Sequence, residues 1–242
     1  MTGTAARRMQ ASKVKTFPRS QLKARAGAHD TSRSEFVYQA LLEAIRQGRL
    51  RQGDRVREDE ISALLNVSRT PVREAVHRMQ GRGLLSLSGG RGLVVATLSR
   101  QQMIELYAFR ELLEGGAARF AAQYASSHEI DTLNQLLRAF AEAGNDFAKG
   151  DRLNTQFHQT ICIAARNGYL MNTLDDIRDL LALLQTGKLP DRCALSLTEH
   201  ANIVRAIEER APEKAELAAR QHVREACQAQ LRLLTHSAMA AG

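Results

Sequence analysis

The sequence predicts a mainly α-helical protein, built from an N-terminal winged helix-turn-helix and a C-terminal antiparallel six-helix bundle. Residues 59–85 contain two short amphipathic helices joined by a tight turn. Two β-prone runs around a glycine-rich turn follow directly, and from Ser99 onward leucine and alanine recur at helical spacing. We expect four segments: a disordered basic tail over 1–30, the winged helix-turn-helix over 31–98, the helical domain over 99–236 and a flexible C-terminus over 237–242.

The helix-turn-helix is predicted from an apolar stripe on each of its two helices. The stripe residues are Ile61, Leu64 and Leu65 on the first helix, and Val72, Val76 and Met79 on the second. Between the helices, Asn66 tolerates the left-handed backbone that a tight turn needs. Ser68 or Thr70 is expected to cap the second helix, and Pro71 falls in its first turn, where a missing N–H costs little. Arg69, Arg73 and Arg78 are left for solvent or for a ligand.

The segment after the second helix favours DNA over solvent as the partner of these arginines. Taken alone, the arginines fit the solvated face of an ordinary surface helix. However, the runs 84–88 and 93–97 flank Gly89-Gly90-Arg91-Gly92, a pattern typical of a β-hairpin. A hairpin directly after such a helix is a wing, whose tip brings backbone and Arg91 close to a phosphate or the minor groove. The helix N-terminus would enter the major groove, where arginine recognises guanine.

Residues 36–98 resemble the winged helix-turn-helix of GntR-family bacterial transcription regulators, most closely through the segment NVSRTPVREAVHRM. The resemblance implies a set of DNA contacts on the recognition helix and in the wing: Ser68, Arg69, Thr70, Arg73, Gly89, Gly90 and Arg91. Asp59 departs from family members that place a DNA-contacting arginine there, so we do not include it. The partner implied is a double-stranded operator.

The charge distribution agrees with a DNA-binding N-terminal half. Residues 1–30 carry seven Lys and Arg against one acid, residues 31–99 carry eleven against seven, and residues 100–242 carry sixteen against eighteen. Counterion release from phosphates rewards a positive field of this kind. The tail either adds nonspecific DNA affinity or is an inert extension or a misassigned start. Neither a membrane-spanning run nor a signal segment is found, so we expect a cytoplasmic protein.

The helical domain is predicted to contain six helices, near 100–126, 129–148, 150–166, 169–187, 192–210 and 212–236. Three histidines border its apolar stripes: His158, His200 and His222. Asn154 precedes His158 by four residues and shares its helix face. Three inward histidines and an amide oxygen would suit zinc, nickel, manganese or iron, whereas each histidine taken singly fits a hydrogen-bonded core residue. Cys162, Cys193 and Cys227 are expected to be small core residues, without a disulfide or a zinc site.

Residues 100–230 resemble the FCD ligand-binding domain of the FadR/VanR-like group, through FRELLEGGAARFAA, NTQFHQTI and EHANIVRAIEER. In many members an acidic residue and three histidines bind a divalent metal, and the matching positions are Asn154, His158, His200 and His222. Asparagine replaces the commoner aspartate, so the metal's charge is left unneutralised and attraction for an anionic effector should rise. Arg110 matches a position that often pairs with an effector carboxylate. Its alternative role is an ion pair with Glu114 at i+4.

We therefore predict a homodimeric regulator that reads a palindromic operator and responds to a small carboxylate bound beside a divalent metal, zinc in the first instance. Repression is the sign that the family implies. Two alternatives remain: a structural metal or a metal-free polar core and, ranked below these, a metal-dependent hydrolase. The sequence offers no obvious general base beside the histidines, neither an HExxH motif nor an inward glutamate at a close offset, so we expect no enzymatic activity.

Overall fold

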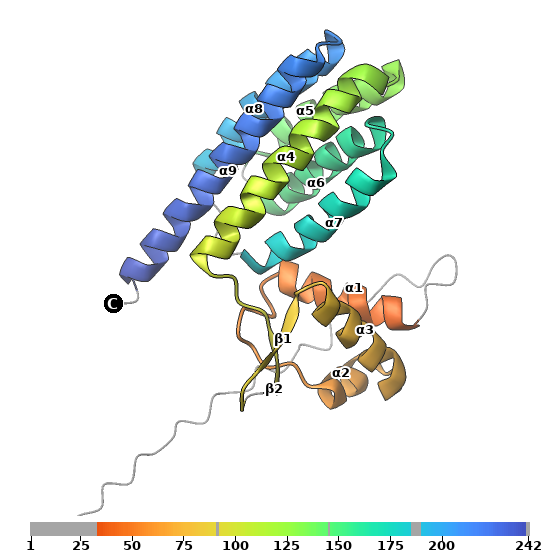
Figure 1. Ribbon diagram of the computed structural model, residues 1–242, viewed down its shortest axis with the longest axis vertical. Coiled ribbons are helices and arrows are strands. Elements are labelled where there is room, and N and C mark those ends of the chain that lie inside the picture. The colour runs from red at the N-terminus through yellow and green to blue at the C-terminus, as the bar shows by residue number, and fades with distance from the viewer. Residues whose placement is uncertain (1–32, 91, 145, 185–189, 241–242) are drawn as a thin grey trace, which may run out of the picture.

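The computed structural model describes residues 33–90, 92–144, 146–184 and 190–240, and the helical fold class is confirmed. Figure 1 shows a small N-terminal domain beneath an elongated helical domain, with the chain crossing between them once before α4. The N-terminal elements are α1 (Arg33–Arg46), α2 (Glu58–Leu65), α3 (Arg69–Gly81), β1 (Leu85–Ser88) and β2 (Gly92–Val95). Within the described part of the chain, no helix is both long and apolar enough to span a membrane.

The predicted helix-turn-helix forms for the physical reasons given by its sequence. Val72, Val76 and Met79 are buried in the core of the domain, each 4% exposed or less. Asn66 ends α2 with φ 53° and ψ 47°, the left-handed conformation that the turn requires. Ser68 takes the N-cap position of α3, although no capping hydrogen bond from its side chain is found there. The exposed hydroxyl thus stays available for another partner.

The wing is an antiparallel hairpin, as predicted, with β1 and β2 paired from Leu85↔Val95 to Ser88↔Gly92. Gly90 and Gly92 have φ values of 78° and 75°, which explains the glycine-rich turn. Leu85 and Val95, paired at the base of the hairpin, are buried in the core with α1 and α3, whereas Leu87 nearer the tip is exposed, so the hairpin packs by its base and projects its tip into solvent. Arg91 lies outside the described residues.

The helical domain consists of α4 (Arg100–Tyr124), α5 (Ser127–Ala143), α6 (Phe147–Ala164), α7 (Gly168–Leu181), η1 (Ala182–Leu184), α8 (Pro190–Glu208) and α9 (Pro212–Ala240). Ser99 with Gln102, and Ser126 with Glu129, form capping boxes that start α4 and α5. α7 ends at Leu181 in a short 3-10 turn, six residues before the predicted end. The turn buries Ala182, Leu183 and Leu184, which a continued helix would place on different faces.

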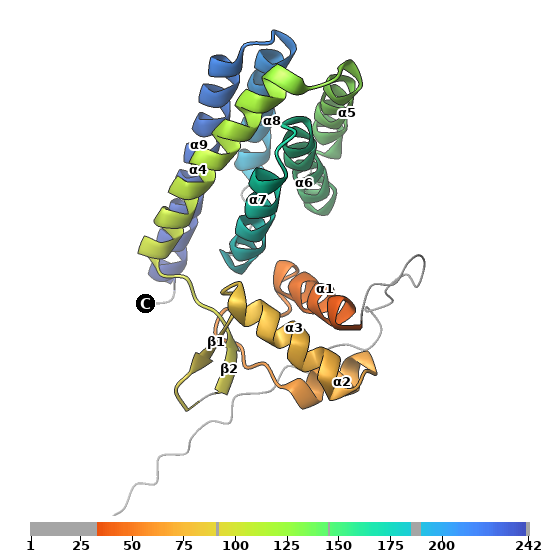
Figure 2. The ribbon, with the colours of Figure 1, turned by 45° about the vertical axis from the view of Figure 1, so that its right-hand side comes forward.

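Helices α4 and α9 run side by side along the whole domain (Figure 2). Their close approach depends on Gly115, because a Cβ atom there would lie 2.8 Å from the Cγ atom of Arg220 on α9. The core between the helices is rich in alanine, including Ala117, Ala118 and Ala121. Small residues bring the helices close together, and this closeness lets side chains of α4 reach residues on α6 and α9.

The two domains share a packed contact at the end of α7. Ala182 and Leu183 are part of the same buried cluster as the apolar residues of α1, α3 and the wing. The Gln52 side-chain amide donates to the carbonyl of Leu183 and accepts from the backbone N–H of Leu98. The turn η1, at the end of α7, therefore belongs to the helical domain by sequence and to the N-terminal core by packing; Figure 2 shows this end of α7 above α1 and α3.

Candidate DNA interface and metal centre

The predicted DNA contacts on the recognition helix α3 are all exposed. Ser68, Thr70, Arg69 and Arg73 lie at its N-terminal end, where unpaired backbone N–H groups also favour a phosphate. Gly89 and Gly90 are exposed at the tip of the wing. The fold thus presents these residues to solvent, and their contacts with DNA stay a prediction.

Two acidic side chains of α2 hold the recognition arginines. The Arg69 guanidinium lies 3.1 Å from Asp59, and the Nε atom of Arg73 donates to Glu58 at 3.1 Å. Asp59, which the sequence analysis excluded as a DNA contact, thus acts on a predicted contact. The ten-residue separation of Asp59 and Arg69 gives no helical signal, because the pair forms across the turn.

His158, His200 and His222 converge in the interior of the helical domain. They come from α6, α8 and α9 and are 6%, 1% and 3% exposed. One ring nitrogen of each lies within 4.8 Å of the other two. Three imidazoles from three helices at this separation form a suitable arrangement for a divalent cation. The predicted convergence of the three histidines is therefore present in the fold.

The hydrogen bonds of His158 leave one of its nitrogens for a ligand. Its Nδ1 atom lies 3.1 Å from Oε2 of Glu114 on α4, while its buried Nε2 atom has no hydrogen-bond partner among the described residues. Burying an imidazole nitrogen without a partner is costly. A carboxylate on one nitrogen and an unsatisfied second nitrogen is the arrangement of a metal-binding histidine, so the residues fit a metal.

His222 has the same kind of orienting carboxylate. Its Nδ1 atom lies 2.7 Å from Oε2 of Glu199. Burial lowers the pKa of His222 to about 4, against the raising effect of Glu199, so the ring is neutral at pH 7 and able to coordinate a cation. The hydroxyl of Ser196 lies 3.3 Å from Nε2 of His200, whose ring stacks on Phe157 at a centroid distance of 4.2 Å.

Glu114 was expected only as a helix-surface partner of Arg110, and the structure gives it a larger role. The Nε atom of Arg110 donates to Oε1 of Glu114 at 2.6 Å, and both side chains are largely buried. Burial alone would raise the pKa of Glu114, but Arg110 and His158 hold it well below its usual range. Two inward glutamates, Glu114 and Glu199, reach the histidines through tertiary contacts that the search for a glutamate at a close sequence offset does not reveal.

Asn154 lies on α6 one turn before His158 and is half-buried. It therefore occupies the helix face expected of a fourth ligand. Cys162 is buried and Cys227 half-buried, in agreement with core roles, and the Cys193 side chain lies outside the described residues. His77 and His128 are exposed, away from the buried triad.

A small cavity of about 10 Å³ adjoins His158. Its walls come from α4, α6, α7, α8 and α9: Glu114, Ala117, Ala118, His158, Ile161, Cys162, Leu174, Arg178, Ile203 and Ala219. A volume of this size holds about one water molecule. Arg178 is a cation of this wall that the sequence analysis did not single out, because nothing in the spacing of α7 shows which face meets the histidines.

Comparison with known proteins places both domains. Residues 33–95 match the family described as "Bacterial regulatory proteins, gntR family". Residues 105–225 match the FCD domain family. A probable D-xylose utilization operon transcriptional repressor of Paenarthrobacter nicotinovorans is 35% identical over 187 residues, covering 74% of this chain and 80% of the relative. The Nta operon transcriptional regulator of Aminobacter aminovorans is 31% identical over 162 residues, covering 66% and 76%.

The fold is also that of a solved structure. E. coli McbR/YncC superposes with a TM-score of 0.74 at 18% identity, over 84% of this chain and 99% of that one. The two relatives found by sequence are named as transcriptional regulators. The exposed recognition helix, its wing and the helical domain behind them therefore make this chain a DNA-binding transcriptional regulator that belongs to the GntR family and carries an FCD domain.

Proposed function

We propose that this regulator is a homodimeric repressor that contains one divalent metal per chain and releases a palindromic operator when a small carboxylate binds. The observation that carries the proposal is the buried Nε2 atom of His158, which has no hydrogen-bond partner among the described residues, on a ring that converges with those of His200 and His222. Repression and a palindromic operator are the properties that the family implies. The repressor named among the relatives supports the same sign here.

His158, His200 and His222 would hold the metal, with the Asn154 oxygen as a fourth ligand. Imidazole favours zinc, with nickel, manganese or iron as alternatives. The ion would supply a fixed positive charge that attracts an anionic ligand. Glu114 and Glu199 would accept hydrogen bonds from the Nδ1 atoms of His158 and His222, which turns each Nε2 atom inward.

A carboxylate effector is supported by the charges around the histidines. The proposed divalent ion and Arg110 together bring three positive charges, which exceed the two negative charges of Glu114 and Glu199, and Asn154 adds none. In the form that the sequence suggests, the effector carboxylate would pair with Arg110. An arginine and a metal ion that act together on one group favour an anionic ligand, and a carboxylate suits both.

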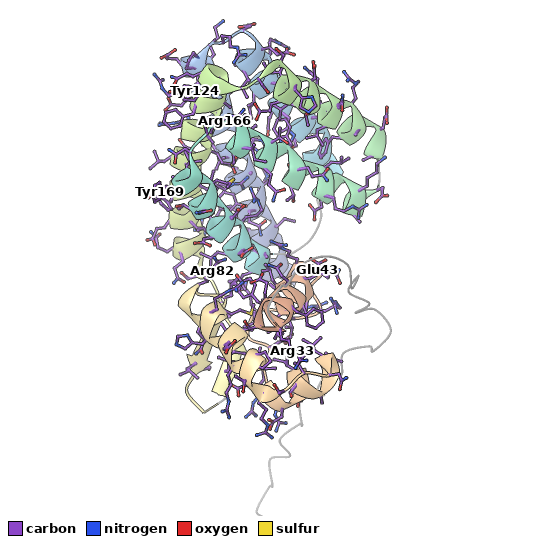
Figure 3. All side chains as sticks on the ribbon, turned by 90° about the vertical axis from the view of Figure 1, so that its right-hand side faces the viewer. Arg33, Glu43, Arg82, Tyr124, Arg166 and Tyr169 are labelled. Carbon is purple, nitrogen blue, oxygen red and sulfur yellow. The ribbon has the colours of Figure 1, made fainter. Side chains whose placement is uncertain are left out.

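Homodimerisation is supported by an apolar face on α4 and α7. Phe109, Leu112 and Tyr124 are 48%, 55% and 54% exposed on α4, and Tyr169 is 90% exposed at the start of α7. Tyr124 and Tyr169 project from the same edge of the domain (Figure 3). Large apolar side chains gathered on one face mark an interaction surface. A second copy would cover it and set the two recognition helices at half-site spacing.

Metal analysis of the purified protein tests the centre. We expect about one divalent ion per chain. His158→Ala, His200→Ala and His222→Ala should each lower that content, whereas His128→Ala, an exposed histidine on α5, should not. Full metal content in all three triad variants would refute the proposed centre.

Operator binding tests the DNA-reading part separately. Selection from a random duplex library would define the operator, and Arg69→Ala or Arg73→Ala should each weaken specific binding by about 1–3 kcal/mol. His77→Ala, an exposed change further along α3, is the matched control. Unchanged specific binding in both arginine variants would show that α3 does not read the operator.

A further inference from the structure

We infer that Arg178 of α7, in place of Arg110, receives the acidic group of the effector; this inference rests on the proposed function. Arg178 lines the same small cavity as His158 and Glu114. It thus reaches the cavity beside His158 from α7, whereas Arg110 lies on α4 and is not part of the cavity wall. Two arginines are near the site, and the difference between their present partners decides which one can accept a new anion.

An incoming carboxylate cannot readily displace Glu114 from its ion pair with Arg110. The two side chains are only 13% and 10% exposed, and Glu114 also holds His158. An effector that took Arg110 would leave the Glu114 carboxylate buried without its cation. Breaking a buried ion pair in this way is strongly unfavourable.

The pair between Arg178 and Asp175 is open to exchange. Asp175 lies three residues earlier on α7 and is 47% exposed, while Arg178 is 23% exposed. An effector carboxylate can therefore replace Asp175, whose own carboxylate passes to water at little cost. The result is a charge-assisted pair deeper in the domain, where it is stronger than the exposed pair it replaces.

The thiol of Cys162 on α6 does not compete for the charge of Arg178. Cys162 lines the same wall, and burial raises the pKa of its thiol to about 12. The thiol is thus neutral at physiological pH and offers Arg178 no full negative charge. Glu114 in the same lining is already paired with Arg110 and His158, so neither residue takes up the charge of Arg178.

The position of Arg178 also connects the cavity to the DNA-binding domain. The next residue, Asp179, is buried against α1 and α3, where its carboxylate accepts from Tyr38 at 3.0 Å and from Arg46 at 2.8 Å. A cavity with room for about one water must widen to admit a carboxylate ligand. Movement of α7 on ligand entry would act directly on the contacts of Asp179.

Calorimetric titration of the zinc-loaded full-length protein with acetate, lactate, malonate and citrate tests the assignment. For the acid that binds best, Arg178→Gln should raise the Kd about ten- to a hundredfold. Arg178→Lys should recover part of that loss because it restores the charge. Asp175→Asn should lower the Kd a few-fold by removing the competing carboxylate, and Glu213→Gln, an exposed acid paired with Arg119, is the control.

The outcomes separate this assignment from the proposed function. The assignment would be overturned if Arg178→Gln, shown by circular dichroism to be folded, bound the acid with the same Kd as the wild type. The proposed function would still stand in that case. A higher Kd in Asp175→Asn than in the wild type would also overturn the assignment of Arg178. If none of the four acids binds the wild type, the carboxylate effector itself is refuted, and the role of Arg178 with it.

A second readout follows the ligand to the DNA-binding domain. The acid that binds best should change amide hydrogen exchange in α1 around Tyr38 in the wild type, and Arg178→Gln should abolish that change at equal ligand occupancy. An exchange change in α1 that persists in Arg178→Gln would show that the signal travels by another route.

Discussion

The carboxylate of Asp179 on α7 accepts a hydrogen bond from the hydroxyl of Tyr38 on α1 at 3.0 Å, although the two residues are 141 positions apart. Arg46 and Arg82 donate to the same carboxylate, and Arg82 also reaches Asp176. Burial, together with the charge of Asp179, raises the pKa of Tyr38, so its hydroxyl remains a donor. Arg82, labelled in Figure 3 at the boundary of the two domains, caps the recognition helix. This cluster joins the DNA-binding domain to the wall of the cavity.

Asp179→Asn should weaken the junction between the domains. The substitution leaves Arg46 and Arg82 without their shared charge at a carboxylate that is only 10% exposed, so we expect a loss of about 1–3 kcal/mol. Calorimetry should show the two domains melting further apart in temperature. Asp176→Asn, which removes a 51% exposed carboxylate from the same Arg82, should cost less than about 1 kcal/mol. Equal effects of the two substitutions would contradict a special role for Asp179.

Asp59→Asn and Glu58→Gln should each tighten DNA binding. Both acids hold a recognition arginine in the free protein, and releasing it removes a competitor of DNA as well as a negative charge. The pairs are exposed, so the gain should be about two- to fivefold in Kd and should shrink at high salt. Fluorescence anisotropy over a range of salt concentrations measures it.

The control for the charge change alone is Glu43→Gln, which removes one negative charge from α1, where Glu43 bonds to Gln47. Its effect on DNA affinity should be the smaller. If all three variants bind DNA equally tightly, net charge is the whole cause and the specific pairing is not needed.

Glu199→Gln should weaken metal binding. Glu199 lies 2.7 Å from Nδ1 of His222, and such an orienting carboxylate typically contributes ten- to a hundredfold to metal affinity, so we expect a loss of about that size. Competition with a zinc-binding dye measures the affinity. Glu209→Gln, an exposed acid paired with Lys214, should leave the affinity unchanged. An unaltered zinc affinity in Glu199→Gln would remove Glu199 from the site.

Glu129 should give the helical domain an acid-sensitive contribution to stability. Burial alone would raise its pKa, but hydrogen bonds from Ser126 and the charge of Arg166 lower it below the usual range of a glutamate. The stabilisation is therefore complete above the unfolded pKa and is lost as pH falls through the lower folded pKa. Glu129→Gln should flatten the dependence of melting temperature on pH below about 4.5. A curve identical to that of the wild type would show that other carboxylates cause the slope.

Local sequence signals predicted most of the fold because they act within a few residues. The apolar stripe of Val72, Val76 and Met79, the left-handed Asn66 and the glycine turn before Gly92 each specify their element without tertiary information. The end of α7 was placed too late because its 3-10 turn forms to pack Ala182 and Leu183 on the other domain. That contact depends on residues more than a hundred positions away.

The candidate site likewise contains residues that local patterns predict and residues that only tertiary contacts reveal. The three histidines were predicted from their place beside apolar stripes, and the fold brings them together. Glu114 was seen only as a partner of Arg110, because the i+4 spacing is local and the contact to His158 is not. Arg178 was missed since a cation on an amphipathic helix gives no sign of which wall it faces.

The smallness of the cavity beside His158 has a consequence for how much effector the cell must hold before genes respond. A cavity with room for about one water molecule must open to admit a carboxylate, and the apparent affinity is reduced by the fraction of molecules in which it is open. Under the proposed function, the stiffness of α7 would then set the response threshold. Stronger hydrogen bonds from Tyr38 and Arg46 to Asp179 would raise the effector concentration needed for a response, and weaker ones would lower it.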